Sequence, residues 1–504
     1  MTALTCALGI HGPRRLRVGA CSKHVSKRAA DRKSPVDGRG VFMVVLPRLF
    51  RRAALGILFL RTLGAAEPTV AVGVARSDIT PELPIRLSGY QSRPAEATRV
   101  QMPMTARGLA IGSDAAGPVV LITAEVIAVS ERVSEAVATA VRAKYPAITR
   151  ERIAVCATHQ HTGPAIAGTI PFMFSRDLPV DEQARIDRYT AKLQEKLIAV
   201  ALAALADRKP ARLAWAQGKT DFAVNRRLIV DGKHTGYKAT PGGPVDHALP
   251  VLRAVDEQGG VRAVLVNYAC HCTTLKGGDN YVHPDWAGEA AKRIEGTNGG
   301  AVALVAIGCG ADSDPQPRGL PAVATNGGAV AEEVARVMAG EMRAVGQVTH
   351  AAFRRIELPL GRTVPREELE ARLKGKPNIA YAAAQFLRQL DAGKPLPAAV
   401  PYPVQAWVFG GDFAMVFLGG EVVAEYALRL KRELGVSRLW VNAYANHVPC
   451  YIPSRQVLQE GGYEADHAMD YYGWPTRLAE DTEDRIVRTV HDVLPANFLK
   501  GSPR

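Results

Sequence analysis

Short apolar runs alternate with amphipathic stretches along most of this chain. The run at 119–124 (VVLITA) is apolar and rich in β-branched residues, which is typical of a strand buried on both faces. The next stretch, 132–144, repeats Ala and Val at helical spacing and ends before Tyr145 and Pro146. A strand followed by a helix in this way indicates a layered α/β fold with the sheet inside.

The same alternation continues to residue 494. Further strands are predicted at 153–158, 263–269, 301–307, 404–409, 413–418 and 438–444. Helices are predicted at 180–207, 288–295, 328–340, 366–374, 379–391, 422–434 and 480–494. Because no repeat or low-complexity linker interrupts the pattern, residues 67–500 are expected to form one α/β domain built on a layered mixed sheet. Residues 340–400 are predicted to be a helical insertion in that domain.

The first 66 residues differ from the rest in composition. They hold 13 Lys and Arg against 2 acidic residues, so they carry +11 of the formal net charge of +14. A segment from Met43 combines arginines, the apolar block 53–60 and the small residues Gly64-Ala65-Ala66, the arrangement of a secretory signal. We therefore expect 43–66 to be a signal peptide and 1–42 to be an over-predicted upstream segment, with a translated basic tail as the alternative. The protein is then expected to be exported, to the periplasm or beyond the cell.

Composition excludes several classes of protein. Without the leader the charge is only about +3, so a nucleic-acid partner is not expected. No run of 18 apolar residues occurs, so no integral membrane span is expected in the mature form. The mature chain has an odd number of cysteines and no C-x-x-C zinc pattern. Buried thiols are favoured over a single disulfide pair.

The strongest local motif is Thr158-His159-Gln160-His161-Thr162-Gly163-Pro164, at the end of a predicted strand. Residues two apart in an extended segment project to the same side, so the imidazoles of His159 and His161 can converge on one point. Neutral imidazole is a good ligand for zinc. The strand-end position favours a binding site over two ordinary loop histidines.

Four more polar segments follow other predicted strands. They contain His271, the acidic and hydroxyl-bearing loop 308–315, Glu421 and Tyr451. Ligands of layered α/β folds bind beyond the carboxyl ends of strands, so these segments are expected to form one site with the histidine pair. Taken alone, His271 is better explained as a core histidine, and Glu421 as a residue that favours a helix N-terminus.

In their order along the chain, these motifs resemble those of the neutral ceramidase family, the neutral/alkaline non-lysosomal ceramidases. Residues 158–164 resemble the family's T-H-T-H-S-G-P, 310–315 its G-D-V-S-P-N, 420–421 its P-G-E, and 444–454 its A-N-x-Y-x-x-Y-x-T-T. The segments 73–81, 225–226, 267–274 and 462–464 also match, so the resemblance covers roughly 72–495. It implies a zinc-dependent amidase that cleaves N-acyl lipids.

Carried over residue by residue, the resemblance implies the zinc ligands His159, His271, Glu421 and Tyr451. It also matches His161 and Arg226 to further site residues and Ser313 to the family's proposed catalytic serine. In the mechanism that we expect for such a zinc amidase, Arg226 and Tyr463 hold the oxyanion and His161 transfers the proton. Two histidines and one carboxylate suit a catalytic zinc with room for water. Asp285 is expected either to orient a ligand histidine or to cap a turn.

The chain departs from the family pattern in two places. Its hexapeptide is G-A-D-S-D-P, which puts Ser313 between two acids. It also ends soon after the last predicted helix, so the family's C-terminal immunoglobulin-like domain is expected to be absent. We therefore expect a small-molecule N-acyl lipid or amide substrate, with short-chain N-acyl amines preferred to ceramide. Residues 172–174 (Phe-Met-Phe) are expected to pack onto the core, with the lining of an acyl channel as the alternative.

Two other functions remain open from the sequence. A strand followed by H-x-H also occurs in amidohydrolase barrels, although Lys276, His283 and Asp312 fit that pattern poorly. The other possibility is a non-enzymatic exported protein that binds lipid or sugar through a degenerate site. The metal content of the purified protein separates this last possibility from both enzymes.

The signal-peptide hypothesis predicts that the mature protein begins near Glu67. N-terminal sequencing of the protein from its native host measures this directly. A protein that begins at Met1 and keeps the leader would show the hypothesis to be wrong.

Overall fold

The structure is a computed structural model that describes residues 69–411 and 413–500. The predicted upstream segment 1–42 and signal peptide 43–66 lie outside the described residues. All the described residues belong to one compact unit. None of the helices among them is long and apolar enough to cross a membrane.

A large mixed sheet forms one half of this unit. Its strand order is β11-β10-β9-β5-β1-β2-β3-β4, and β13 pairs with β5 beside this path. The strands are β1 (Thr69–Asp78), β2 (Thr105–Ile111), β3 (Val119–Ala124), β4 (Ile153–Ala157), β5 (Lys209–Lys219), β9 (Ala248–Asp256), β10 (Val261–Tyr268), β11 (Val302–Ile307) and β13 (Arg343–Val345). Only the β3–β4 and β10–β11 pairs are parallel. This mostly antiparallel pairing is not that of a parallel eight-stranded barrel, so the amidohydrolase alternative is wrong.

A smaller sheet covers one face of the large one. It has the order β14-β15-β16-β18, from β14 (Val348–Pro359), β15 (Ala399–Phe409), β16 (Phe413–Leu418) and β18 (Leu439–Asn442). Aromatic side chains fill the space between the two sheets, where Trp215 of β5 stacks on Phe413 of β16 with ring centroids 4.4 Å apart. Burial of such large apolar rings is a major source of stability.

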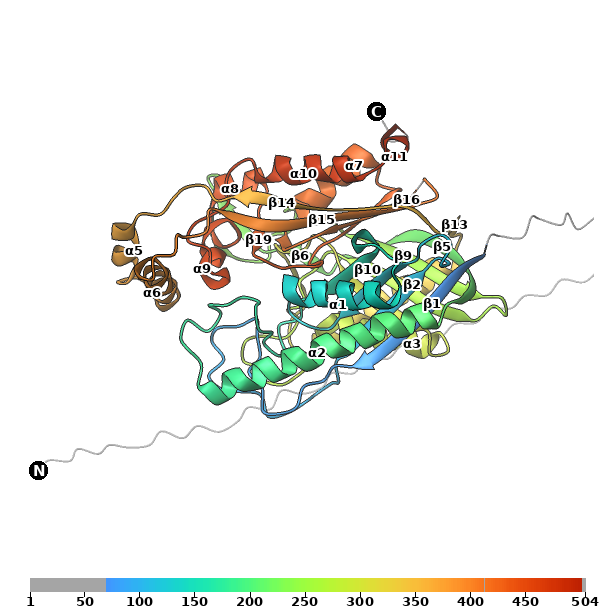
Figure 1. The fold of residues 1–504 in the computed structure, drawn as a ribbon, viewed down its shortest axis with the longest axis horizontal. Coiled ribbons are helices and arrows are strands. Elements are labelled where there is room, and N and C mark those ends of the chain that lie inside the picture. Colours follow the sequence, from blue (N-terminus) through green and yellow to red (C-terminus); the bar gives the residue numbers. More distant parts are fainter. Residues whose placement is uncertain (1–68, 412, 501–504) are drawn as a thin grey trace, which may run out of the picture. The chain divides into compact units, whose positions relative to one another are not determined.

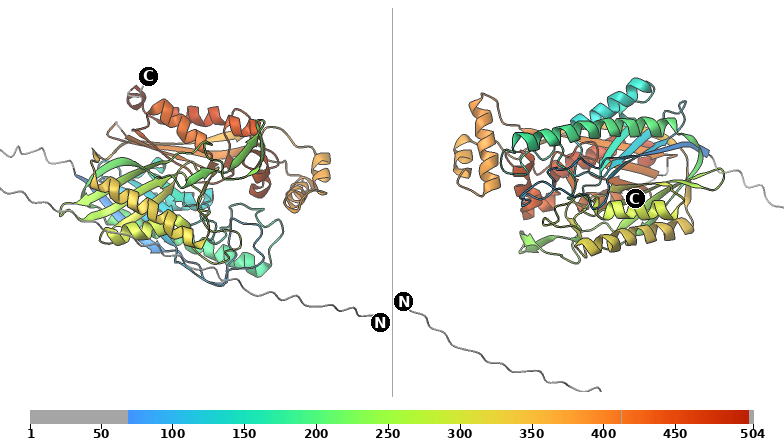
Figure 2. Two further views of the ribbon diagram at one scale, coloured as in Figure 1. Left: turned by 180° about the vertical axis from the view of Figure 1, so that it is seen from behind. Right: turned by 90° about the horizontal axis from the view of Figure 1, so that it is seen from below.

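Helices cover both outer faces, which gives four layers (Figure 1). On the large sheet lie α1 (Glu131–Lys144), α2 (Val180–Ala206), α3 (Asp285–Thr297) and α4 (Leu320–Ala339), seen from outside in Figure 2. On the small sheet lie α7 (Ala424–Leu434) and α10 (Thr482–Val493). The predicted layered α/β fold with a mixed sheet is confirmed.

Helix α2 lies unusually close to the large sheet. Its buried side chains face β1 and β2, where Gly73 and Gly108 take the place of larger residues. A Cβ atom on Gly73 would lie 2.0 Å from the carbonyl oxygen of Ala204, and one on Gly108 would lie 2.8 Å from Val200. Glycine is therefore needed at both positions for the helix to pack.

The segment 340–400 was predicted to be a helical insertion. In the structure only its middle is helical, because it contains β13 and β14, then α5 (Arg366–Arg372) and α6 (Pro377–Asp391), and then the start of β15. The two helices project from one side of the layers (Figure 1). The helical prediction failed over β14 because most of that strand is only half buried and lacks a strong apolar pattern.

Three short ladders tie the loops together next to the strand ends. They pair β6 (Ala223–Asn225) with β12 (Ser313–Pro315), β7 (Arg227–Val230) with β8 (Lys233–Tyr237), and β17 (Glu421–Val422) with β19 (Tyr451–Ile452). Four short helical segments, α8 (Arg455–Glu460), η2 (Tyr463–His467), α9 (Ala468–Tyr472) and α11 (Ala496–Lys500), complete the C-terminal part, and η1 (Arg150–Arg152) precedes β4. The five cysteines among the described residues are buried free thiols.

Candidate metal centre

The loop after β4 carries the histidine pair. The backbone N–H of Thr158 donates to the carbonyl of Ala124, and that of His159 donates to the carbonyl of Val126, so the loop is fixed to the end of β3. His159 has a φ of 56°, in the left-handed region that side chains other than glycine's seldom adopt. Such strain persists only where the surroundings enforce it, and it is concentrated at functional sites.

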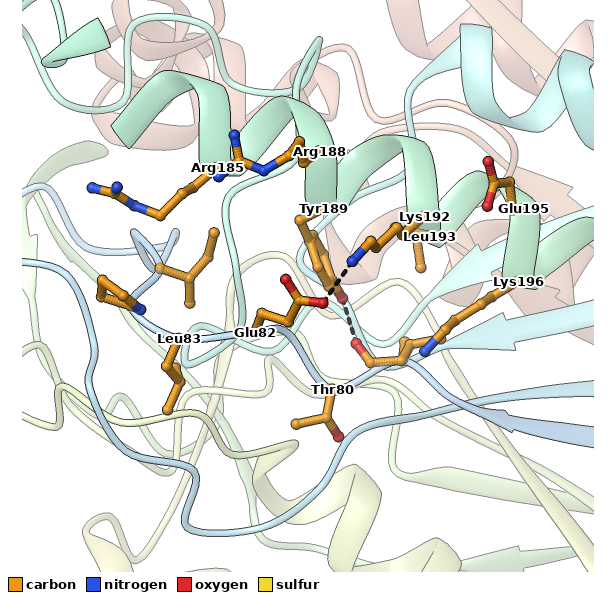
Figure 3. A pocket seen from close by; sticks show the side chains of 13 residues that line it. Thr80, Glu82, Leu83, Arg185, Arg188, Tyr189, Lys192, Leu193, Glu195 and Lys196 are labelled. Carbon is orange, nitrogen blue, oxygen red and sulfur yellow. Dashed lines mark hydrogen bonds and ion pairs between the residues drawn. The ribbon is translucent and has the colours of Figure 1, made fainter. Parts of the chain in front are cut away.

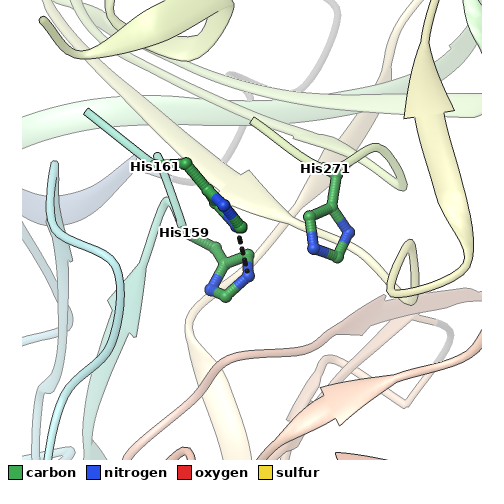
Figure 4. Close-up of side chains that lie close together, drawn as sticks. All are labelled: His159, His161 and His271. Carbon is green, nitrogen blue, oxygen red and sulfur yellow. Dashed lines mark hydrogen bonds between the residues drawn. The ribbon is translucent and has the colours of Figure 1, made fainter. Parts of the chain in front are cut away.

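Three histidines meet at this point (Figure 4). They are His159, His161 and His271, and their ligand atoms all lie within 4.8 Å of one another. His271 comes from the loop after β10, where its backbone N–H donates to the carbonyl of Ser313. This arrangement agrees with the prediction from the sequence that the loops at these strand ends meet in space.

Each imidazole is oriented by a backbone carbonyl. The Nδ1 atom of His159 lies 2.7 Å from the carbonyl oxygen of Ile127, that of His161 lies 3.1 Å from Gly89, and that of His271 lies 3.0 Å from Gly310. A carbonyl can only accept a hydrogen bond, so all three Nδ1 atoms carry the proton in the neutral rings. The three Nε2 atoms therefore present lone pairs, and those of His159 and His161 are 3.1 Å apart.

Glu421 supplies a carboxylate to the same point. Its Oε2 atom lies 2.9 Å from Nε2 of His159 and 3.3 Å from Nε2 of His271. No hydrogen-bond donor faces this oxygen, although the residue is only 2% exposed. Burial raises the pKa of Glu421, but positive charge on the side of His159 and His271 outweighs this effect and holds the pKa well below its usual value.

Tyr451 completes the set of predicted ligands. The β17–β19 ladder pairs Glu421 directly with Tyr451. The phenol oxygen of Tyr451 is 3.4 Å from Nε2 of His271 and accepts a hydrogen bond from Nη2 of Arg226 at 3.1 Å. Burial raises the pKa of this phenol well above its usual value.

Lone pairs that converge in a buried space repel one another unless a cation lies between them. Two or three imidazole nitrogens, one carboxylate oxygen and one phenol oxygen are nitrogen and oxygen ligands that suit zinc. The unpartnered oxygen of Glu421 is a buried charge that would be costly without such a cation. The residues present therefore fit a divalent metal ion.

Arg226 stands beside this cluster. Its Nε donates to Glu464 at 2.9 Å and its Nη1 to Asp314 at 3.2 Å. Burial lowers the pKa of Arg226, but Tyr451, Asp314 and Glu464 outweigh this effect and hold the pKa well above its usual value. The guanidinium is therefore charged and fixed in position.

Ser313 and Tyr463 lie in the segments next to these groups. Ser313 begins β12, its carbonyl accepts the N–H of His271 at 2.9 Å, and its fully buried Oγ has no hydrogen-bond partner. The ring of Tyr463 lies 5.3 Å from that of Tyr451, and burial raises the pKa of its phenol. The structure thus brings all eight predicted site residues to one region.

Several residues of the site were not identified from the sequence. The hydroxyl of Tyr472 donates to Oε1 of Glu421, and the ring of Tyr444 stacks on His159 with centroids 4.4 Å apart. Glu464 binds both Arg226 and Arg227. Tyr444 and Glu464 lie inside motifs that were recognised, whereas no local pattern marks Tyr472.

Asp285 does not orient a ligand histidine. Its carboxylate accepts hydrogen bonds from the backbone N–H groups of Thr274, Leu275 and Trp286. The indole of Trp286 then donates to the carbonyl of His271 at 2.9 Å. Asp285 therefore acts on the site only through the loop that it holds.

Comparisons with known proteins agree with this fold. The solved structure of neutral ceramidase from Pseudomonas aeruginosa matches with a TM-score of 0.64 and 18% identity, over 86% of this chain and 75% of that one. A structure of a ceramidase complexed with C2 matches with the same TM-score and identity, over 84% of this chain and 74% of the other. Both likenesses show a shared architecture.

Sequence comparison also gives a similarity to ceramidases. The neutral ceramidase of Pseudomonas aeruginosa strain PAO1 is 25% identical over 230 residues, which are 44% of this chain and 33% of that protein. The matched region thus spans a third of the relative's length. The model of the neutral/alkaline non-lysosomal ceramidase N-terminal domain matches residues 70–315. Over these residues the chain is similar to the neutral/alkaline non-lysosomal ceramidase family.

We predict that His159→Ala and His271→Ala each abolish stoichiometric zinc binding, because each removes an atom that faces the shared point. Metal analysis of the purified variants measures the loss, and far-ultraviolet circular dichroism checks the fold. His491→Ala is the matched control, because its ring pairs with Glu433 away from the cluster. Full zinc occupancy in both ligand variants would contradict the assignment.

We also predict that Tyr472→Phe weakens zinc binding by about 10–100-fold, because removal of a group that orients a ligand typically has this effect. Competition with a chelator of known affinity gives the dissociation constant. Tyr471→Phe is the control, since its hydroxyl donates to Gln91 instead. Equal affinities of the two variants would mean that the bond to Glu421 does not matter.

Proposed function

We propose that the protein is a zinc-dependent amidase that hydrolyses N-acyl substrates. The observation that carries the proposal is the cluster of three imidazoles, of which His159 and His271 turn Nε2 toward the unpartnered carboxylate oxygen of Glu421. Similarity to the ceramidase family over residues 70–315 supports an amide as the bond that is cleaved. The zinc ligands in this proposal are His159, His271, Glu421 and Tyr451.

Zinc held by these residues would act as a Lewis acid on the acyl carbonyl and lower the pKa of a neighbouring water molecule toward about 7. The chain supplies the proton transfer. His161 is more exposed than the other two imidazoles, and its Nδ1 is occupied by Gly89, so Nε2 is the atom that accepts a proton from water. The same atom can then donate that proton to the leaving amine.

Arg226 and Tyr463 stabilise the negative charge that develops on the acyl oxygen. The Arg226 guanidinium is held by Glu464 and Asp314, so it needs no reorganisation during the reaction. The raised pKa of Tyr463 keeps its phenol protonated and able to donate. Preorganised donors of this kind commonly contribute 10²–10³-fold to the rate.

A cavity of about 420 Å³ beside the histidine loop is our candidate for the acyl chain. Met173 and Phe174 line it, together with Ser88, which precedes the Gly89 that holds His161. Phe172 instead packs against Phe386 of α6, as expected for a core residue. This cavity size suits a short or medium acyl chain, in keeping with the predicted preference for such substrates.

We also propose that the protein acts outside the cytoplasm. This proposal rests on the signal-like pattern of residues 43–66 alone. It accords with the mature charge of about +3, which gives no strong attraction to anionic lipid.

We predict that zinc-loaded protein hydrolyses short-chain N-acyl amines faster than long-chain ceramide in micelles. Release of the free amine across a series of acyl lengths measures the preference, and removal of the metal with a chelator should abolish turnover. Faster cleavage of long-chain ceramide would contradict the preference. Zinc binding without cleavage of any amide would contradict the proposed amidase activity. No zinc binding at all would contradict the proposed function and favour a binding protein.

We predict that Ser313→Ala lowers turnover more than it lowers zinc content, because its buried hydroxyl has no partner among residues 69–411 and 413–500 and is free to bind water or substrate. Steady-state kinetics and metal analysis of the same sample separate the two effects. Ser134→Ala removes another buried serine, one that donates within α1, and is the control. Unchanged turnover would leave Ser313 without a catalytic role.

A further inference from the structure

A second large cavity lies between α2 and the segment 79–85 (Figure 3). Its volume is about 460 Å³, within the usual range for small-molecule sites. It contains none of the residues that we assign to the metal centre. It is therefore a separate candidate site.

The floor of this cavity is apolar. Ile79, Ile85 and Leu193 line it and are almost fully buried. The one polar group at this depth, the hydroxyl of Tyr189, donates to the carbonyl of Ile79 at 2.8 Å. With that donor satisfied, the floor offers an apolar surface to a ligand.

The rim of the cavity is basic. Four cations and two anions line it: Arg185, Arg188, Lys192, Lys196, Glu82 and Glu195. Arg185 is already bound to Glu96 and Asp181. Lys196 donates to the carbonyl of Asp78. Arg188 and Lys192 are therefore the cations that remain for a ligand.

Lys192 has a partner that is easily exchanged. Its ammonium lies 2.6 Å from a carboxylate oxygen of Glu82, but the Glu82 side chain is 83% exposed. Exposed ion pairs of this kind contribute little because water competes for both charges. The charge of Arg188 helps to lower the pKa of Glu82, but its guanidinium makes no hydrogen bond or ion pair within the described part of the chain.

We propose that this cavity binds an amphipathic monocarboxylate, such as a medium-chain fatty acid. The carboxylate takes the place of Glu82 on Lys192 and pairs with Arg188, while the chain lies on the apolar floor. Charge complementarity selects the anion, and the apolar floor selects the tail. The inference does not depend on the proposed amidase activity, since it uses none of its residues.

Calorimetric titration of the zinc-loaded protein with decanoate, below its critical micelle concentration, tests the proposal. The double variant Arg188→Glu/Lys192→Glu should bind decanoate at least tenfold more weakly than the wild type. Arg142→Glu/Lys144→Glu carries the same charge change on exposed residues at the end of α1 and should bind within twofold of the wild type. Any carboxylate bound at the zinc is common to all three proteins and cancels in the comparison.

Three further measurements sharpen the test. Glu82→Gln removes the competing carboxylate and should tighten decanoate binding. Acetate and decanol, which lack the tail and the charge respectively, should each bind at least tenfold more weakly than decanoate. Equal decanoate affinity in the Arg188→Glu/Lys192→Glu variant would overturn the proposal. So would a variant that keeps decanoate binding but loses binding to phosphatidylglycerol vesicles, because that result would make the basic rim a membrane contact.

Discussion

The hydrogen bonds that hold the three imidazoles determine the character of the centre. Because each Nδ1 faces a carbonyl, each Nε2 must present a lone pair to the same small volume. The three carbonyls belong to the segment after β3, the segment before β2 and the loop after β11. The large sheet fixes where these segments lie, and so it fixes the protonation pattern of the rings as well as their positions.

The smaller sheet supplies what the larger one lacks. The histidines come from the large sheet, whereas Glu421 and Tyr451 come from loops that follow strands of the small sheet. The aromatic layer between the sheets holds the two sheets in a fixed relative position, as in the stacking of Trp215 on Phe413. The packing of the two sheets against each other therefore determines the geometry of the centre.

Much of the fold follows from local pattern, but not all of it. The fully buried strands β3 and β16 were predicted residue for residue, because a continuous apolar run marks both ends of such a strand. The strands β5 and β14 were missed, since half-exposed faces dilute their apolar content. The strand β9 was missed although it is mostly apolar and has no exposed residue. The site residues were assembled from resemblance and strand-end position. Tyr472 could not be found in this way, because its bond to Glu421 depends on how α9 folds back.

The parallel ladder of β17 and β19 places Glu421 beside Tyr451, and this placement affects the stability of the folded chain. Residues 70–315, which match the ceramidase N-terminal domain, include His159 and His271 but neither Glu421 nor Tyr451. A metal bound by all four residues would therefore join segments nearly 300 positions apart in sequence and would bind only the folded chain. Such a ligand raises the free energy of unfolding by about 4 kcal/mol at a thousand times its dissociation constant. Metal supply would then govern how long the protein survives proteolysis, as well as how fast it works.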